Sequence, residues 1–397
     1  MNAWKQVKLG CVIEIKHGYA FKGDYISDVP TDNILVTPGN FHIGGGFKAD
    51  KLKYFHNEVS PEYILHGGDI VVTMTDLSKE SDTLGYSAKI PSDGKIYLHN
   101  QRIGLVEFIS EEVFPDYIYW LMRTREYQSY IVGCASGTSI MHTSPSRIKD
   151  FEFTLPSLPE QKAIAGVLSC LDNKIDLLHR QNKTLEAMAE TLFRQWFIEE
   201  AEDDWKQYQI GSFVEHVKVN INPQDRPLDT FCHFSIPAYD NGQKPTLELG
   251  KEIKSNKYLV VDKSILVSKL NPITPRVWGV YKQIFENSVC STEFQVLKPN
   301  NINHYGFFYS LLKSNEVVSE LGMAASGTSG SHQRVKASDI LNISFSIPDI
   351  VAISEFSETI EYHIKKIEMN KEAIGCLVQM RDILLPKLMS GEVRVEY

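Results

Sequence analysis

The feature that most constrains how this chain can fold is an internal duplication. The pentapeptide ASGTS occurs at Ala135–Ser139 and again at Ala325–Ser329, 190 residues later. Two further matches keep the same order at similar offsets: Trp4-Lys5-Gln6 with Trp205-Lys206-Gln207, and Phe151–Pro156 with Ile343–Pro348. Because a repeat of this length is one folding unit used twice, the chain is predicted to consist of two similar halves.

Each half is predicted to be a globular segment of mixed α/β content followed by one long helix. Short β-rich runs such as Asp69–Met74 and Ser264–Leu270 are bounded by Gly, Pro or Asn, and helical spacing at Asp116–Val132 and Tyr305–Leu321 precedes each ASGTS loop. The predicted fold class is α+β, with two similar domains joined by two long antiparallel helices as a pseudo-two-fold duplication. The predicted boundaries are 1–156 for the first domain, 157–204 for the first helix and its linker, 205–348 for the second domain and 349–397 for the second helix.

The first long helix is predicted over Ser157–Phe197. Ser157 and Glu160 have the spacing of a capping box, and Pro159 falls in the first turn, where its missing N–H costs little. Apolar residues then follow the alternating 3-and-4 spacing of a coiled-coil seam, at Ile164, Leu168, Leu171, Ile175, Leu178, Leu185, Ala189, Leu192 and Trp196. Asn182 falls on this seam, where a polar residue can fix the register.

The second long helix is predicted over about Ile350–Leu385, with Pro386 ending or kinking it. Its seam carries Phe356, Ile360, Ile367, Ile374, Leu377, Leu384 and Leu388, together with the polar His363, Asn370 and Arg381. Each helix has one narrow apolar stripe, so the two are predicted to pack on each other antiparallel. The alternative is two independent helices, each lying on its own domain. A helix from Ile164 to Trp196 would be a rod of roughly 48 Å, long enough to set a fixed spacing.

Composition excludes several classes of protein. Apolar residues make up 43% of the 397 residues and charged residues 23%, which is typical of globular chains and not of disordered or collagen-like ones. No apolar run reaches the roughly 18 residues that a membrane span requires, and the N-terminus has no signal-peptide pattern. The six cysteines show no CxxC spacing, which favours reduced thiols in the cytoplasm over disulfides or a zinc site.

The net charge of −9 is unevenly distributed. Residues 157–204 carry −5 and 349–397 carry −3, whereas 1–156 carry −4 and 205–348 carry +3. The acidic charge is thus concentrated in the long helices, and basic residues cluster near the ASGTS loops, whose Ser, Thr, Gln and Arg side chains suit phosphate and base contacts. The candidate DNA-binding residues are Thr138, Ser139, Arg147, Lys149, Lys269, Arg276, Thr328, Ser329, Gln333, Arg334 and Lys336.

Motifs of catalysis are missing from the sequence. It contains no GxxxxGK[ST] loop, no HExxH and no GxSxG, and Asn271-Pro272 is interpreted as a turn. We therefore predict no catalytic residue and no metal site in this chain. An enzyme of unfamiliar type remains the alternative.

The segment Leu155-Pro156-Ser157-Leu158-Pro159-Glu160-Gln161, which leads into the first heptad helix, resembles the central conserved region of type I restriction-modification specificity subunits. Proteins of that family also have an internal duplication and ASGTS-like loops before each helix, so the resemblance spans the whole chain. The second half departs from the pattern, because Ala352-Ile353 stands where the first half has Glu160-Gln161.

The resemblance implies two target-recognition domains that each read one half of a bipartite DNA sequence, with the gap set by the helices. It implies double-stranded DNA, methyltransferase subunits and restriction subunits as partners, with S-adenosylmethionine, ATP and magnesium bound by those partners. Glu160, Gln161, Asn182 and Trp196 are the candidate residues for partner docking or for the coiled coil. The alternative is a two-domain protein–protein scaffold, whose binding need not fall steeply with salt as phosphate binding does.

Overall fold

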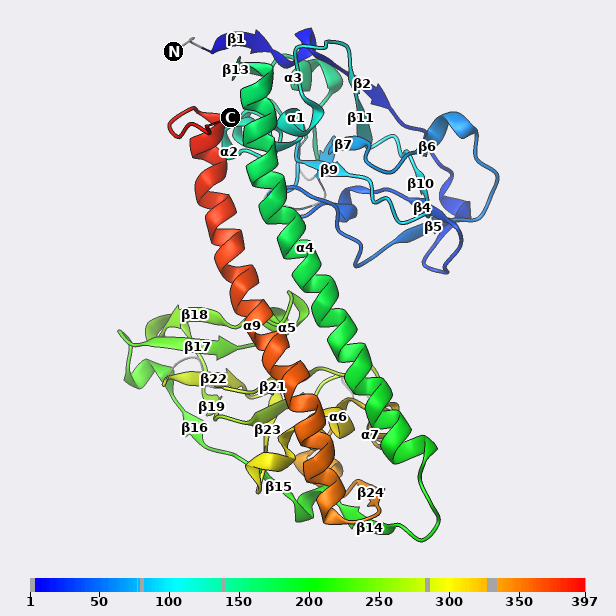
Figure 1. The fold of residues 1–397 in the computed structure, drawn as a ribbon, viewed down its shortest axis with the longest axis vertical. Helices are drawn as coiled ribbons and strands as arrows, with labels where there is room; N and C mark the ends of the chain where they lie inside the picture. The colour runs from blue at the N-terminus through cyan, green and yellow to red at the C-terminus, as the bar shows by residue number, and fades with distance from the viewer. Residues whose placement is uncertain are drawn as a thin grey trace. The chain divides into compact units, whose positions relative to one another are not determined.

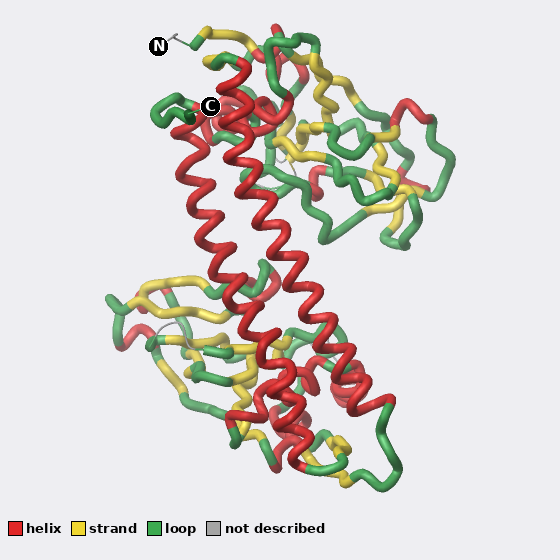
Figure 2. Tube along the Cα trace, viewed as in Figure 1, coloured by secondary structure: helices red, strands yellow, loops and turns green. Residues whose placement is uncertain are grey.

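The computed structural model describes residues 4–76, 78, 82–137, 140–282, 286–326 and 334–396. The chain divides into two compact units (Figures 1 and 2). Unit 1 consists of Met1–Ile175 and Gly375–Tyr397, and unit 2 of Asp176–Ile374. Each unit therefore contains one part of each long helix.

Unit 1 contains a four-stranded antiparallel sheet with strand order β2-β11-β7-β9 and a five-stranded sheet with order β3-β5-β4-β10-β6. Two antiparallel pairs, β1 with β13 and β8 with β12, complete it. The strands are β1 (Lys5–Lys8), β2 (Ile13–His17), β3 (Ile26–Ser27), β4 (Asn33–Leu35), β5 (Lys53–Phe55), β6 (Ile64–Leu65), β7 (Ile70–Thr73), β8 (Thr75–Asp76), β9 (Ser87–Lys89), β10 (Ile96–Leu98), β11 (Ile103–Phe108), β12 (Met141–His142) and β13 (Glu152–Leu155).

Unit 2 repeats this plan with different loops. Its four-stranded sheet has the order β15-β23-β20-β21, its five-stranded sheet the order β16-β19-β22-β17-β18, and β14 pairs with β24. The strands are β14 (Lys206–Gln209), β15 (Val214–His216), β16 (Asn220–Ile221), β17 (Thr230–Phe234), β18 (Thr246–Leu249), β19 (Lys257–Leu259), β20 (Ser264–Ser268), β21 (Val277–Val280), β22 (Ser288–Ser291), β23 (Phe294–Pro299) and β24 (Ser344–Ile347).

The strand pairing confirms the predicted duplication. In both five-stranded sheets one central pair is parallel, β4 with β10 in unit 1 and β17 with β22 in unit 2, and the other pairs are antiparallel. Strand β7 (IVVT) and strand β20 (SILVS) are buried throughout, because each lies inside its four-stranded sheet and is covered on both faces. The predicted α+β class with two similar halves is therefore confirmed.

The short helices differ in one respect from the sequence prediction. The run 116–132 forms two helices, α1 (Pro115–Leu121) and α2 (Arg125–Gly133), and 305–321 forms α6 (Tyr305–Lys313) and the start of α7 (Asn315–Ser326). The breaks lie at Thr124 and Ser314, which are extended and whose hydroxyls accept hydrogen bonds from the following helix. The helical spacing of apolar residues continues across Thr124 and Ser314, so this spacing alone does not predict the breaks. The other short helices are α3 (Pro145–Lys149), α5 (Ile236–Asp240) and α8 (Ala337–Leu341).

The two long helices are α4 (Leu158–Arg194), extended by a π-helical turn at Gln195–Glu199, and α9 (Ile350–Met389). Helix α9 continues through Pro386 as far as Met389, so of the two predicted effects of this proline, an end or a kink, the structure excludes the end. A proline near a helix terminus removes one backbone hydrogen bond, and the remaining bonds hold the last turn; the Ser390 amide donates to the Pro386 carbonyl at 3.0 Å.

Within each unit the two long helices are antiparallel, as predicted (Figure 1). In unit 1, Asp172 of α4 pairs with Arg381 of α9. Glu160, which precedes Asp172, pairs with Arg394, which follows Arg381, so the two chain directions are opposite. In unit 2, Asn370 donates to Asn182. Further along α4, Phe197 lies beside Phe356, which precedes Asn370 on α9, with the two ring centres 5.3 Å apart. The predicted seam is buried against the domains: Ile164, Leu168 and Leu388 join the core of unit 1, and Ala189, Phe356 and Ile360 that of unit 2.

Candidate nucleic-acid interface

In unit 1 the described part of the first ASGTS segment lies against the chain that follows β7. Strand β12, just after ASGTS, pairs with β8, and an isolated bridge joins Ser136 to His142. The His142 ring Nδ1 is hydrogen-bonded to Thr75 Oγ1 at 3.1 Å, and the Thr143 amide donates to the Met74 carbonyl. Two loops that are about 60 residues apart in sequence are thereby held as one surface.

Asp76 organises this loop cluster, and the sequence analysis missed it. Its carboxylate accepts hydrogen bonds from the amides of Ser78 and Thr83 at 2.6 Å and from the Thr83 hydroxyl at 2.8 Å. Burial acts against the charged carboxylate, but these hydrogen bonds outweigh it and lower the pKa of Asp76. The signal was an Asp followed two residues later by Ser, the pattern of a side chain that closes its own turn.

Of the two basic candidates in unit 1, the structure brings only one to this cluster. Arg147 lies on α3, and its Nη1 donates to Ser136 Oγ at 3.2 Å and to the His142 carbonyl at 3.5 Å. Lys149, two residues later, instead pairs with Glu14 of β2 at 2.8 Å. We therefore retain Arg147 as a residue of the candidate surface and place Lys149 beside β2.

In unit 2 the corresponding loop follows β20, and it contacts the residues that come after the second ASGTS segment in the sequence. An isolated bridge connects Leu270 with Arg334, and the Val335 amide donates to the Lys269 carbonyl at 3.0 Å. Lys269 Nζ donates to the Thr292 carbonyl at 2.5 Å and lies 5.2 Å from the centre of the Tyr258 ring. The same two loops thus meet in both units.

The remaining basic candidates of unit 2 surround this junction. Arg334 pairs with Glu293 at 3.0 Å, and its side chain is 57% exposed. Arg276 binds Asp240 of α5 through Nε and Nη2 at 2.7 and 3.0 Å, and it is more buried. Lys336 precedes α8 and is exposed, while its amide donates to Asp339. Thr138, Ser139, Thr328, Ser329 and Gln333 lie outside the described residues.

The helix-start candidates make contacts inside unit 1. Glu160 is buried, and its carboxylate accepts from Trp4 Nε1 at 3.0 Å and from Arg394 Nη1 at 2.6 Å. Gln161 is fully buried; its side-chain oxygen accepts from the Phe114 amide at 2.8 Å, and its nitrogen donates to the carbonyls of Glu112 and Pro156. Glu160 therefore holds the start of α4 to the N-terminal segment and to the C-terminal tail, and Gln161 holds it to the segment that precedes α1.

The second half has no such polar contacts at the matching positions, as its sequence indicated. Ile353 stands where unit 1 has Gln161; it is fully buried in the apolar core of unit 2, and Ala352 packs beside it. The two other helix candidates lie in unit 2, where Asn182 Oδ1 accepts from Asn370 at 2.8 Å and the Trp196 ring packs against Phe356 at 5.7 Å.

A charged cluster in unit 1 joins the long helices to the domain. Arg123 at the end of α1 is buried and donates to Asp172 of α4, to the Tyr119 hydroxyl at 2.7 Å and to the Gly44 carbonyl at 2.9 Å. Gly44 begins a run of three glycines, Gly44-Gly45-Gly46, all of which have positive φ. Burial opposes the charge on Asp172, but Arg123 and Arg381 outweigh it and lower the pKa of Asp172.

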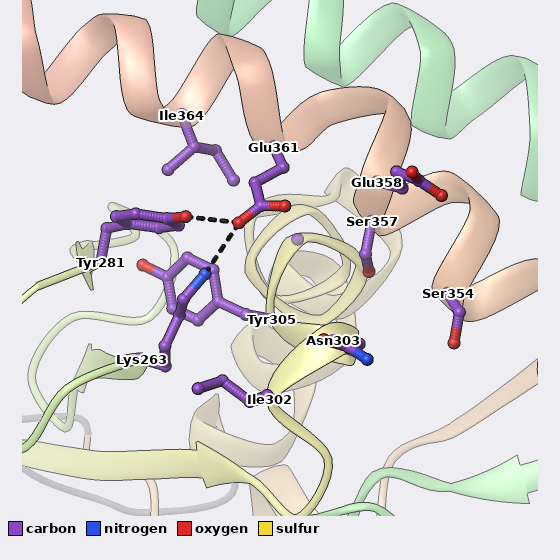
Figure 3. A pocket seen from close by; sticks show the side chains of 11 residues that line it. Lys263, Tyr281, Ile302, Asn303, Tyr305, Ser354, Ser357, Glu358, Glu361 and Ile364 are labelled. Carbon is purple, nitrogen blue, oxygen red and sulfur yellow. Dashed lines mark hydrogen bonds and ion pairs between the residues drawn. The ribbon is translucent and has the colours of Figure 1, made fainter.

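Unit 2 has a polar cavity of about 470 Å³ between α6 and α9 (Figure 3). Glu361 of α9 accepts hydrogen bonds from the Tyr281 hydroxyl and from Lys263 Nζ, the latter at 3.3 Å. The Tyr281 hydrogen bond is the main reason that the pKa of Glu361 falls to about 2. Ser357 lines the opposite side, and its hydroxyl accepts from the Phe307 amide at 2.9 Å. Lys263, Tyr281 and Glu361 thus bind one another at one side of the cavity, and Ser357 binds the backbone of α6.

Two features are absent from the described part of the chain. Among those residues, no His, Cys, Asp and Glu side chains gather in a group of three or more that could hold a metal ion. In the same residues, no helix is both long and apolar enough to cross a membrane.

Each unit thus combines an α+β module, two loops that meet beside basic side chains and a part of each long helix. Comparison with known proteins shows what this arrangement is similar to. Residues 1–187 match the family described as "Type I restriction modification DNA specificity domain". The chain is thus similar to type I restriction-modification specificity subunits, the family that its sequence motifs resemble.

Two relatives come from Methanocaldococcus jannaschii. The chain is 26% identical to the type I restriction enzyme MjaIX specificity subunit over 72% of this chain and 70% of that one. It is 25% identical to the MjaVIII specificity subunit over 93% and 94% of the two chains. The crystal structure of the type I restriction-modification S subunit from M. genitalium shares the fold, with a TM-score of 0.62 and 16% identity over 98% of this chain and 96% of that one.

Proposed function

We propose that this chain is the DNA-reading subunit of a type I restriction-modification complex, in which each module reads one half of a bipartite target. The observation that carries the proposal is that both units join the loop after the buried central strand to the ASGTS segment, beside Arg147 in unit 1 and Arg334 in unit 2. Two copies of one binding surface suit a target with two half-sites. The target-recognition domains are 1–156 and 205–348, and 157–204 and 349–397 supply the helices.

Specificity subunits are non-catalytic as a family. We propose that methyl transfer and DNA cleavage are carried out by the partner subunits of this chain. Methyltransferase subunits would bind S-adenosylmethionine, and restriction subunits would bind ATP and magnesium. The side chains of this chain would bind and orient double-stranded DNA. Its modest negative charge is compatible with that role if partner subunits contribute part of the phosphate contact.

Exposed apolar side chains on the long helices support docking of methyltransferase subunits there. On α9, Tyr362 and Met369 of unit 2 lie seven residues apart and are 69% and 61% exposed, while Met380 and Ile383 of unit 1 are 51% and 59% exposed. Apolar residues that recur on one helix face outside the buried seam are suited to a further helix. Replacing Met369 by Glu should abolish copurification with a coexpressed type I methyltransferase subunit, whereas Glu358→Gln on the same helix should not.

The experiment that tests DNA reading is titration of the purified chain with duplex DNA over a series of salt concentrations. Phosphate binding releases counterions, so the logarithm of affinity should fall linearly with the logarithm of salt, with a slope of about −0.9 per phosphate contact. A randomised duplex library should then yield a two-part consensus. Binding that ignores salt, or no binding to any duplex, would leave the protein–protein scaffold as the better account.

A further inference from the structure

The turn between β20 and β21 carries an exposed isoleucine. Ile273 is 68% exposed, although it lies in a loop between two buried strands. Residues at the tip of a tight turn are usually Gly, Asn, Asp or Ser. A branched apolar side chain is unusual at this place, and its exposure leaves it available for contact with a ligand.

The position of Ile273 is fixed by the loop around it. The Thr274 amide donates to the Asn271 carbonyl at 2.9 Å, which closes a turn with Pro272 and Ile273 at its centre. Asn271 has a positive φ of 49°, a conformation that asparagine tolerates, and Pro272 is buried. Gly322 of α7 lies beneath, because a Cβ there would come within 3.3 Å of Ile273 Cγ1. The isoleucine is therefore presented on a rigid support.

The same loop belongs to the candidate DNA surface of unit 2. Its first residue, Lys269, is hydrogen-bonded to Val335 just beyond the ASGTS segment, and its last, Arg276, is held by Asp240. Side chains on an exposed turn can reach the base edges in the major groove of B-DNA, where sequence is read directly. The apolar group that this groove offers is the C5-methyl of thymine, which aliphatic side chains contact.

We propose that Ile273 is a specificity-determining residue that contacts the C5-methyl group of one thymine in the half-site read by unit 2. This inference rests on the proposed DNA-reading function. In unit 1 the chain after β7 instead enters β8 and is organised by the charged Asp76. The two modules therefore present different chemistry at this place, as expected if they read different half-sites.

The test removes the methyl group from the DNA and the isoleucine from the protein. The preferred duplex is first selected from a random library with the full wild-type chain, and each thymine is then replaced in turn by deoxyuridine. Affinities are measured for wild type and for Ile273→Ala. The control is Leu228→Ala. Leu228 belongs to the same unit and is 79% exposed, but it lies in the loop before β17. Helix α5, whose Asp240 holds Arg276 of the proposed surface, follows that strand.

At one thymine, the replacement should weaken wild-type binding about fourfold, the ratio that corresponds to returning one methyl group to water. The same replacement should have no effect on Ile273→Ala, and Leu228→Ala should behave as wild type. An unchanged penalty in Ile273→Ala at every thymine, or no penalty in wild type at any thymine, overturns the inference. Equal weakening of thymine and uracil duplexes by Ile273→Ala would also overturn it and would indicate a wedge in the minor groove. Failure of the wild-type chain to select any sequence would refute the proposed function itself, and this inference with it.

Discussion

Arg123 Nη1 lies 2.5 Å from Asp172 Oδ2, and the other oxygen of Asp172 lies 2.8 Å from Arg381 Nη1. One carboxylate on α4 thus joins the end of α1 to α9 within unit 1. Arg123 is 4% exposed and Asp172 22%, so water screens this contact little. The cluster fixes how the globular part of unit 1 is attached to the helix pair beside it.

Asp172→Asn should therefore destabilise the chain strongly, because it leaves two cations beside a neutral side chain. Removing one partner of a buried ion pair costs about 3–5 kcal/mol. Asp28→Asn is the matched control: its carboxylate lies 2.7 Å from Lys53 Nζ, but it is 79% exposed, and such pairs contribute about 1 kcal/mol or less. Urea unfolding monitored by circular dichroism measures both. Similar losses in the two variants would contradict the burial argument.

The Asn182–Asn370 contact predicts strong coupling between two seam positions of unit 2. Asn370 is 2% exposed and donates to Asn182 Oδ1 at 2.8 Å and to Gln181 Oε1 at 2.9 Å. Asn370→Leu alone should cost about 1–3 kcal/mol, because it leaves a partly buried amide unpaired. Replacing both asparagines by leucine should recover most of that loss. Additive losses in a double-mutant cycle of unfolding free energies would show that the two residues act independently.

Glu361 predicts a dependence of stability on acid pH. Its pKa is about 2 in the folded chain, against an ordinary value of 4.5, mainly because the Tyr281 hydroxyl donates to it. A carboxyl whose folded-state pKa is lowered adds stability that is fully present above pH 4.5 and is lost as the pH falls toward 2. Glu361→Gln should thus be less stable than wild type at pH 6, and the difference should shrink at pH 3. Glu358→Gln, on the same helix, is the control, and a difference that stays constant with pH would contradict the prediction.

The affinity, consensus sequence and salt dependence of DNA binding by single variants should distinguish residues that contact bases from residues that contact phosphates. Arg334→Ala should cost about 1–3 kcal/mol and relax the consensus at one position if the guanidinium binds a guanine edge. Lys336→Ala and Arg147→Ala should weaken all duplexes alike and reduce the salt slope by about 1 if they contact phosphate. Lys95→Ala is a control at a side chain that is 56% exposed and lies beside Asp93. Unchanged affinity and consensus in all three variants would refute the assignment of this surface.

The sequence predicts the duplication, the two long helices and their antiparallel seam, because each leaves a periodic or repeated pattern. It also predicts the turn at Asn271-Pro272, which the structure confirms. It does not predict that Asp172 meets Arg123, because that contact depends on how α1 packs against α4. Asp76 was missed for a similar reason: its hydrogen bonds are local, but its place beside β12 depends on sheet pairing.

The candidate DNA site was predicted only in part. Basic residues near ASGTS can be found by inspection, yet only the fold distinguishes Arg147, which faces Ser136, from Lys149, which pairs with Glu14. The two residues are separated by two positions on a short helix and therefore point in different directions. The ASGTS side chains themselves stay predictions, since Thr138, Ser139, Thr328 and Ser329 lie outside the described residues.

The last prediction concerns the proposed role of the long helices as a spacer. Inserting four residues after Arg180 in α4 and four after Glu372 in α9 adds about one turn to each helix, or about 6 Å with roughly 40° of net rotation. Base pairs of B-DNA rise about 3.4 Å each, so the preferred gap between half-sites should grow by about two base pairs. Each half-site should keep its own sequence, because the recognition loops are unchanged.

Library selection with the insertion variant measures this gap. A four-residue insertion also shifts a heptad seam, so the variant must first show native-like helix content and cooperative unfolding. A single insertion in α4 alone is the control, because it puts the two seams out of register and should destabilise the chain instead of moving the gap. A folded double-insertion variant that still selects the original gap would show that the helices do not set the spacing. The globular modules or the partner subunits would then determine it.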